Sequence, residues 1–157
     1  MNRDDRQSVI RVRDLCVADL DEVVRIDAVH TGENKPEYWG DVMRDFLGAQ
    51  PGSTRIGLAA EDSGRFIGYL LGEVRAFEFG SDACGWVFAV GVDPVSLLEG
   101  VASTLLKEIC RRFRELGVSE VRTMVRRNSV DVLSFFRANG FVGGSFVQLE
   151  LDLEEQA

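Results

Sequence analysis

The stretch at residues 85–106 constrains the fold of this chain more than any other. Residues 85–92 contain no charged side chain, Asp93-Pro94 follows, and Gly100-Val101-Ala102 then begins an amphipathic segment. This pattern predicts a strand buried on both faces, a short loop and a helix. The first N–H groups of a helix have no intrahelical partner and lie at the positive end of the helix dipole, so this helix start is suited to an anion such as phosphate.

Hydrophobic periodicity along the rest of the chain predicts an α+β fold. Helices are expected at residues 18–28, 36–48, 101–116 and 129–139, and strands at residues 9–13, 56–60, 66–77, 118–125 and 146–153. The sequence Glu61-Asp62-Ser63-Gly64 indicates a hairpin between two of these strands. Because the strand at 118–125 follows a helical crossover, we expect it to lie parallel to residues 85–92.

Length and composition limit the class of protein. The 157 residues fit one domain that spans residues 1–157. The net charge of −8 argues against a nucleic-acid partner, and no apolar run approaches the ~20 residues of a membrane span. The three cysteines, Cys16, Cys84 and Cys110, lie in apolar sequence at wide spacings. We therefore expect buried, reduced thiols and a cytoplasmic location.

Charge is unevenly distributed along the chain. Residues 14–62 contain eleven acids and four bases, whereas residues 107–127 contain seven bases and three acids. One interpretation gives the C-terminal half a polyanionic cofactor and the N-terminal half a cationic or neutral substrate. Solvated helix faces are an equal alternative.

Three features together resemble the GNAT N-acetyltransferase family over nearly the whole chain. They are the order of elements, the Val-Asp-Pro after an apolar strand, and Gly140-Phe141 at the end of the last helix. The resemblance implies an α+β, GNAT-like acyl-CoA N-acyltransferase fold. Its mixed, mostly antiparallel central sheet has a splayed parallel pair and helices on both faces. The resemblance also implies acetyl-CoA as cosubstrate, and no metal.

The family's phosphate-binding loop, Arg/Gln-x-x-Gly-x-Gly/Ala, falls on residues 97–102. Gly100 and Ala102 match this pattern, whereas Leu97, Leu98 and Glu99 depart from it. The resemblance implies that backbone amides hold the pyrophosphate and that the end of the preceding strand holds the pantetheine arm. The cofactor-binding residues that it implies are Val90, Gly91, Val92, Leu98, Glu99, Gly100, Val101, Ala102, Ser103, Asn128, Ser129 and Phe136. An ordinary strand-to-helix turn with core packing is the alternative.

Phe136 stands where family members often have a tyrosine that protonates the departing CoA thiolate. A thiol with a pKa near 8.5 leaves without full protonation, so this loss costs roughly one or two orders of magnitude in rate. Core packing beside Val132 and Leu133 is the alternative for Phe136.

Glu73 is the best candidate for the general base, because an acid in the middle of an apolar strand has a raised pKa. Pairing with Arg75 at a solvated position is the alternative, and His30 is a second candidate base that also fits a plain surface position.

The resemblance places the acceptor on the N-terminal helices. Tyr38 and Trp39 are the predicted substrate contacts, beside the acids Glu33, Glu37 and Asp41. Deprotonating a lysine amine at pH 7 costs about 4.6 kcal/mol, against about 1 kcal/mol for an α-amine. A site without an evident base therefore favours an amine of low pKa.

Taken together, the sequence predicts an acetyl-CoA-dependent N-acetyltransferase that transfers the acetyl group directly to an amine. The acceptor is a small amine or a protein N-terminal or lysine amine, with no nucleic-acid or membrane partner, and a homodimer is left open. The alternative is a weakly catalytic or non-catalytic CoA-binding sensor or interaction module of the same fold. Leu97, Leu98, Glu99 and Phe136 favour that alternative.

Overall fold

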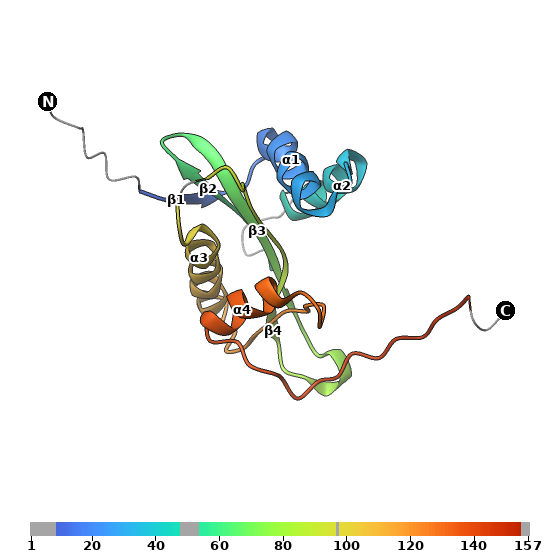
Figure 1. Ribbon diagram of the computed structural model, residues 1–157. Helices are drawn as coiled ribbons and strands as arrows, with labels where there is room; N and C mark the ends of the chain where they lie inside the picture. The colour runs from blue at the N-terminus through green and yellow to red at the C-terminus, as the bar shows by residue number, and fades with distance from the viewer. Residues whose placement is uncertain (1–8, 48–53, 97, 155–157) are drawn as a thin grey trace, which may run out of the picture. The chain divides into compact units, whose positions relative to one another are not determined.

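A computed structural model describes residues 9–47, 54–96 and 98–154 (Figure 1). The chain divides into two compact units, Met1–Met124 and Val125–Ala157, and each is described on its own. The first unit contains the sheet and three of the α-helices, and the second contains helix α4.

The sheet of the first unit is mixed, as predicted. Its strands lie in sequence order: β1 (Arg11–Asp14), β2 (Arg55–Asp62), β3 (Arg65–Arg75), β4 (Cys84–Val92) and β5 (Val121–Arg122). The first four strands pair antiparallel, whereas β5 pairs parallel with β4. The predicted hairpin is confirmed, because Ser63 and Gly64 connect β2 to β3 with φ values of 51° and 81°. Positive φ at both turn residues matches the twist of the flanking strands.

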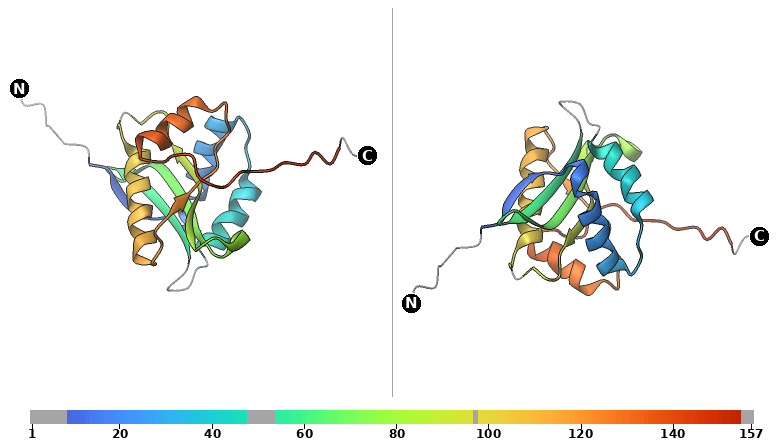
Figure 2. Two further views of the ribbon diagram at one scale, coloured as in Figure 1. Left: turned by 90° about the horizontal axis from the view of Figure 1, so that it is seen from below. Right: turned by 90° about the horizontal axis from the view of Figure 1, so that it is seen from above.

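Helices cover both faces of this sheet (Figures 1 and 2). Helices α1 (Leu20–Thr31) and α2 (Pro36–Leu47) lie on one face, and α3 (Val101–Glu115) lies on the other. Two 3-10 turns, η1 (Val17–Asp19) and η2 (Glu78–Gly80), complete the described elements of this unit. The helix starts and ends follow the predicted signals: Pro36 opens α2, and Gly117 follows α3 in the left-handed conformation.

The two faces of the sheet are packed differently. On the α3 side, Gly72 and Gly85 let the helix approach closely, since a Cβ at either position would collide with Ile109 or Phe113. On the α1–α2 side, Tyr69 of β3 joins a buried cluster with residues of both helices. This second face carries the candidate acceptor contacts.

Strand β4 contains a β-bulge at Phe88. Leu71 pairs with Ala89 and Gly72 pairs with Val87, so Phe88 has no partner on β3. Phe88 is exposed and stacks on Phe46, which corrects the expectation that the whole strand is buried on both faces.

The bulge reverses the face to which later side chains of β4 point. Gly85, before the bulge, faces Phe113 of α3, whereas Gly91, after it, faces Tyr69. The far end of β4 is thereby turned toward α1 and α2.

Strand β5 is parallel to β4, as predicted, but it is shorter than the expected residues 118–125. It pairs only at Gly85 with Val121 and at Trp86 with Arg122. Beyond this point Thr123 donates a side-chain hydrogen bond of 3.0 Å to the Val87 carbonyl, in place of ladder pairing. The parallel pair therefore ends early.

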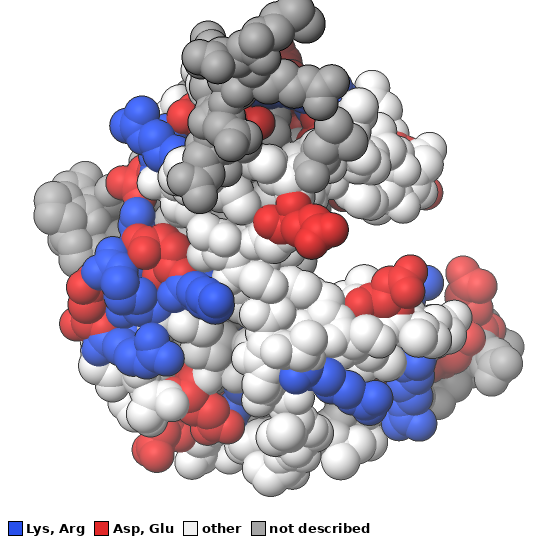
Figure 3. All heavy atoms as spheres, turned by 60° about the vertical axis from the view of Figure 1, so that its left-hand side comes forward, with Lys and Arg blue, Asp and Glu red and all other residues white. Residues whose placement is uncertain are grey.

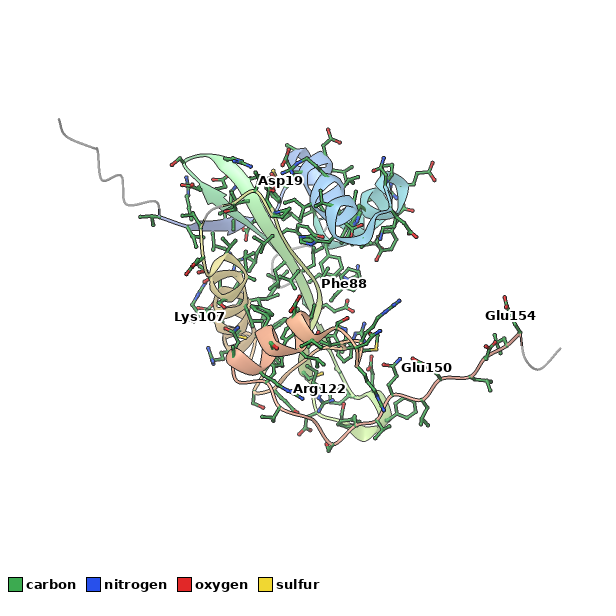
Figure 4. All side chains as sticks on the ribbon, in the orientation of Figure 1. Asp19, Phe88, Lys107, Arg122, Glu150 and Glu154 are labelled. Carbon is green, nitrogen blue, oxygen red and sulfur yellow. The ribbon has the colours of Figure 1, made fainter. Side chains whose placement is uncertain are left out.

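In the second unit, α4 (Val130–Ala138) forms as predicted, whereas the final strand does not. Residues 146–153 are extended without strand pairing; Glu150 lies on this segment and Glu154 directly follows it (Figure 4). Its apolar face, Val147, Leu149, Leu151 and Leu153, is exposed. The alternating pattern correctly predicted an extended backbone, but a β-strand also needs a hydrogen-bonded neighbouring strand.

Two further observations concern the predicted protein class. The three cysteines are unpaired thiols; Cys84 is buried as expected, whereas Cys110 is half-buried and Cys16 is exposed. None of the helices in the described ranges is both long enough and apolar enough to cross a membrane.

Candidate active site

The far end of β4 has main-chain groups that no described strand pairs with. The Asp93 N–H donates to the Ile67 carbonyl at 2.9 Å, and Gly91 is opposite Tyr69 in the register. Because main-chain groups alternate in direction along an antiparallel pair, those of Val90 and Val92 point to the opposite edge. That edge faces β5, which has already ended at Arg122.

His30 of α1 contacts this edge. Its Nε2 atom lies 2.7 Å from the Val92 carbonyl oxygen. A carbonyl oxygen only accepts hydrogen bonds, so Nε2 carries the proton and Nδ1 is the basic nitrogen of the neutral ring. The structure thus places His30 beside the predicted thioester-binding residues.

Asp93 anchors the loop that follows β4. Its side chain is fully buried, and Oδ2 accepts hydrogen bonds from Arg25 at 2.9 Å and from Arg65 at 3.0 Å. Oδ1 accepts from the Val95 amide at 3.0 Å. Burial alone would raise the pKa of Asp93, but the hydrogen bonds from Arg25 and Val95 outweigh it and hold the pKa below its usual range. The loop therefore leaves β4 in one fixed direction.

The loop ends at the N-terminus of α3, where Gly100 is the N-cap with φ +78°. Gly100 has no side chain to cap the first turn, and no acidic residue lies in that turn. A Cβ at Gly100 would contact nothing within 4 Å, so a side chain would fit sterically. The position favours glycine because of its positive φ.

The residues before Gly100 do not add a cation to this helix start. Glu99 is exposed, and the Leu98 amide donates a long bond of 3.4 Å to the Ser96 hydroxyl. Leu97, which stands at the family's Arg/Gln position, lies outside the described residues. Backbone amides are therefore the main donors available to an anion here.

Two basic residues of α3, Arg111 and Arg112, are paired with acids. Arg111 contacts Glu108 and Glu115, and Arg112 contacts Glu108 and Asp14. Positive and negative side chains accordingly lie together on the face that carries α3 (Figure 3). Hydrogen bonds from Arg111 lower the pKa of Glu108 to about 2. These ion pairs fit the interpretation in which the charged residues of α3 form a solvated helix face, rather than the one in which they bind a polyanionic cofactor.

Glu73, the predicted base, lies away from the end of β4. Its two carboxylate oxygens are 3.0 Å from Arg75 Nε and 3.7 Å from Arg55 Nε. Glu73 pairs with Trp86 in the register, four residues along β3 from Tyr69, which corresponds to roughly 13 Å at the rise of a strand. Its role as base stays a prediction, and the geometry at Val92 favours His30.

The predicted substrate residues form an aromatic cluster with β3. The ring centroids of Tyr38 and Trp39 are 5.3 Å apart, and those of Trp39 and Tyr69 are 5.5 Å apart. Tyr38 is exposed, whereas Trp39 and Tyr69 are buried. Burial, and secondarily the nearby Asp27 carboxylate, raises the pKa of Tyr69 well above its usual range. Tyr69 is therefore a neutral phenol at physiological pH.

The remaining predicted residues belong to the second unit. Phe136 is buried, with its ring centroid 5.0 Å from those of Phe135 and Phe141. Asn128 is exposed, and Ser129 is the N-cap of α4. The contacts of Phe136 match the alternative of core packing, and the cofactor role of all three residues stays a prediction.

Sequence analysis did not identify Asp27, Asp93 and Tyr69 as parts of this site. The sequence position of Asp93 could have indicated its role. It directly follows an apolar strand, and an acid buried there requires a hydrogen-bonding or charged partner. His30 was named, but its contact with Val92 joins residues far apart in sequence and has no local signal. The described residues contain no group of three or more His, Cys, Asp or Glu placed to hold a metal.

Comparison with known proteins gives a family match. A model of the acetyltransferase (GNAT) family matches residues 20–141. No curated protein matches the chain. Among solved structures, the chain is similar to the aminoglycoside N-acetyltransferase AAC(6')-Iy in complex with CoA, with a TM-score of 0.80 and 17% identity over 95% of this chain and 98% of that one.

Two other solved structures have the same fold. A ribosomal-protein-alanine N-acetyltransferase from Brucella melitensis biovar Abortus 2308 gives a TM-score of 0.72 and 15% identity, over 92% of this chain and 99% of that one. A transcriptional regulator from Bacillus halodurans C-125 gives a TM-score of 0.75 and 16% identity, over 92% of this chain and 100% of that one. At these identities the similarity establishes the fold alone.

Proposed function

The chain belongs to the acetyltransferase (GNAT) family, and on that premise we propose that it transfers an acetyl group from acetyl-CoA directly to an amine. The observation that carries this proposal is the early end of the β4–β5 pairing. No described strand pairs with the main-chain groups of Val90 or with the Val92 N–H, so these groups are available to the pantetheine arm and to the thioester carbonyl, while the Val92 carbonyl accepts from His30. CoA in the complex of the similar aminoglycoside N-acetyltransferase supports the choice of cosubstrate.

The start of α3 is the proposed pyrophosphate site. The amides of residues 98–102 and the positive end of the helix dipole attract the anion without a dedicated cation. Asp93 holds the first residues of the loop after β4 through its hydrogen bonds from Arg25 and Arg65. Glu99 places a negative charge nearby, so we expect modest cofactor affinity.

The chemical step is an acyl transfer in a ternary complex. The acceptor nitrogen attacks the thioester carbon, the C–S bond breaks, and CoA leaves as a thiolate. The proton lost by the acceptor nitrogen passes to His30 Nδ1, either directly or through one water. His30 is proposed for this role because its Nε2 is held by Val92, which fixes the orientation of the ring.

The second candidate function is a CoA-binding sensor or interaction module. It is favoured by Glu99 beside the phosphate site and by Phe136, which is buried and has no proton to give. The two functions share cofactor binding and differ in turnover.

Calorimetric titration with acetyl-CoA, followed by a CoA-release assay with a panel of amines, tests both functions. The enzyme is expected to bind acetyl-CoA and to release CoA only when an amine is present. His30→Gln, whose side-chain amide can still donate to Val92, should keep cofactor affinity and lower the turnover number. Binding without release supports the sensor module, and failure to bind acetyl-CoA contradicts both.

A further inference from the structure

A carboxylate on the inner side of α1 already holds an ammonium group. Lys35 Nζ lies 3.0 Å from Asp27 Oδ2 and 5.9 Å from the centroid of the Tyr38 ring. The Asp27 side chain is 12% exposed and the Lys35 side chain 32% exposed, so the ammonium reaches the carboxylate from the surface. Asp27 and Tyr38 supply the opposite charge and the aromatic ring that favour an organic cation. We call this position the ammonium site.

With Lys35 at the ammonium site, two buried polar atoms of these helices remain without a hydrogen-bond partner in the part of the chain that the structure describes. Among the described residues, Asp27 Oδ2 accepts no aligned hydrogen bond, and the buried Trp39 Nε1 donates none. Trp39 is only 3% exposed, so water does not replace the missing acceptor easily. Buried polar atoms without a hydrogen-bond partner cost free energy. A ligand with a better-aligned ammonium would satisfy Asp27 Oδ2.

Aromatic rings connect the ammonium site to the end of β4. Tyr38 contacts Trp39, and Trp39 contacts Tyr69, each with edge-to-face geometry. Tyr69 pairs with Gly91 in the sheet, and its ring fills the space that a Gly91 side chain would need. The packed rings thus form a continuous row from Tyr38, which is exposed beside Asp27, to the end of β4, where the proposed thioester position lies.

An ammonium group at Asp27 stays protonated. The pKa of Lys35 is raised, chiefly by its contact with Asp27, and Glu33 adds to this effect. A protonated amine has no lone pair and cannot attack a thioester. An acceptor that places one ammonium at Asp27 therefore needs a second amine to react at the end of β4.

We propose that Asp27 recognises one ammonium group of an acceptor that carries at least two amines, and that Lys35 occupies the ammonium site when the acceptor is absent. This inference rests on the proposed function for the fate of the second amine. Binding of the first ammonium is independent of acetyl-CoA and is tested without it.

The binding test follows the indole N–H resonance of Trp39 during titration with pentylamine, which carries one ammonium. The resonance is assigned by its absence from the Trp39→Phe protein. In the wild type the resonance is expected to shift, with 1-pentanol as the neutral probe that leaves it in place. Lys35→Met removes the internal competitor and should lower the apparent Kd by about tenfold. Asp27→Asn should raise it by at least about thirtyfold.

Two variants control for fold and for general charge effects. Asp21→Asn removes an exposed carboxylate from the first turn of α1, the helix that carries Asp27, and should leave the Kd unchanged. Asp27→Asn combined with Lys35→Met has no unpaired charge, so it should fold and still bind pentylamine weakly. Equal Kd values for the wild type, Asp27→Asn and Lys35→Met, or no shift in any of them, overturn the inference.

A kinetic test separates this inference from the proposed function. The wild type should prefer 1,5-diaminopentane over 5-amino-1-pentanol by roughly tenfold in kcat/KM, because the alcohol lacks the second ammonium. Asp27→Asn should lose this preference. Transfer with the preference intact in Asp27→Asn contradicts the ammonium site and leaves the function standing. Pentylamine binding at Asp27 without transfer to any amine supports the site and contradicts the function.

Discussion

Arg25 donates a hydrogen bond of 2.9 Å to Asp93 and thereby links helix α1 to the loop between β4 and α3. Arg25 also pairs with Glu22 on its own helix, which fixes the guanidinium from both sides. The loop carries the proposed pyrophosphate site at one end, and α1 carries His30 and Asp27. A single buried carboxylate thus couples the cofactor loop to the acceptor side of the sheet.

Asp93→Asn should therefore destabilise the protein. Breaking a buried ion pair leaves uncompensated charge, and since Arg25 and Arg65 are partly exposed, we expect a loss of roughly 2–3 kcal/mol in the free energy of unfolding at pH 7. The pKa of Asp93 is lower in the folded protein than the unfolded value of about 3.9. Its stabilisation is therefore present above that value and is lost as the pH falls through the folded pKa.

Urea unfolding of both proteins at pH 7 and at pH 3 measures this difference. The gap between wild type and Asp93→Asn should shrink at pH 3. Asp41→Asn, which breaks an exposed pair with Arg44, should change stability by no more than about 0.5 kcal/mol. A gap that is the same at both pH values would show that Asp93 acts through packing alone.

Gly100→Val should abolish acetyl-CoA binding while the fold persists. The N-cap conformation at φ +78° costs a β-branched residue about 1–2 kcal/mol, so the helix start should shift to relieve it. Gly117→Val is the matched control, because Gly117 has φ +80° at the other end of α3 and also open space around it. Thermal shift with acetyl-CoA compares the two. Equal protection in both variants would place the pyrophosphate elsewhere.

Glu99→Gln should lower the Kd for acetyl-CoA, because it removes an exposed negative charge next to the helix start. The gain should be larger at low salt, since screening acts over about 8–10 Å at ordinary ionic strength. Glu115→Gln removes the same charge at the far end of α3 and should leave the Kd unchanged. An unchanged Kd in Glu99→Gln at all salt concentrations would mean that its side chain points away from the ligand.

Local patterns in the sequence identified the elements that depend on local physics. The Ser63-Gly64 turn, the Pro36 helix start and the Gly117 helix end follow from the backbone preferences of those residues. The parallel direction of β5 followed from the handedness of crossovers.

Features that depend on tertiary contacts had no such signal. The bulge at Phe88 decides which face Gly91 takes, yet nothing in the sequence of β4 separates it from a regular strand. The contact of His30 with Val92 and the partners of Asp93 arise only when distant segments meet. Residues 146–153 have the alternation of a strand without the pairing, because periodicity describes one segment and a ladder requires two.

Phe136→Tyr distinguishes the enzyme from the sensor module. If Phe136 merely lacks a useful acid, the variant should raise turnover with the amine panel by up to about 10²-fold with little change in acetyl-CoA affinity, because the hydroxyl acts mainly in the transition state. The ring is buried between Phe135 and Phe141, so a hydroxyl left unpaired should cost roughly 1–3 kcal/mol of stability. Phe141→Tyr adds a hydroxyl to the same cluster and should not raise turnover. If wild type and Phe136→Tyr both bind acetyl-CoA but neither releases CoA faster than buffer, the protein is a binding module.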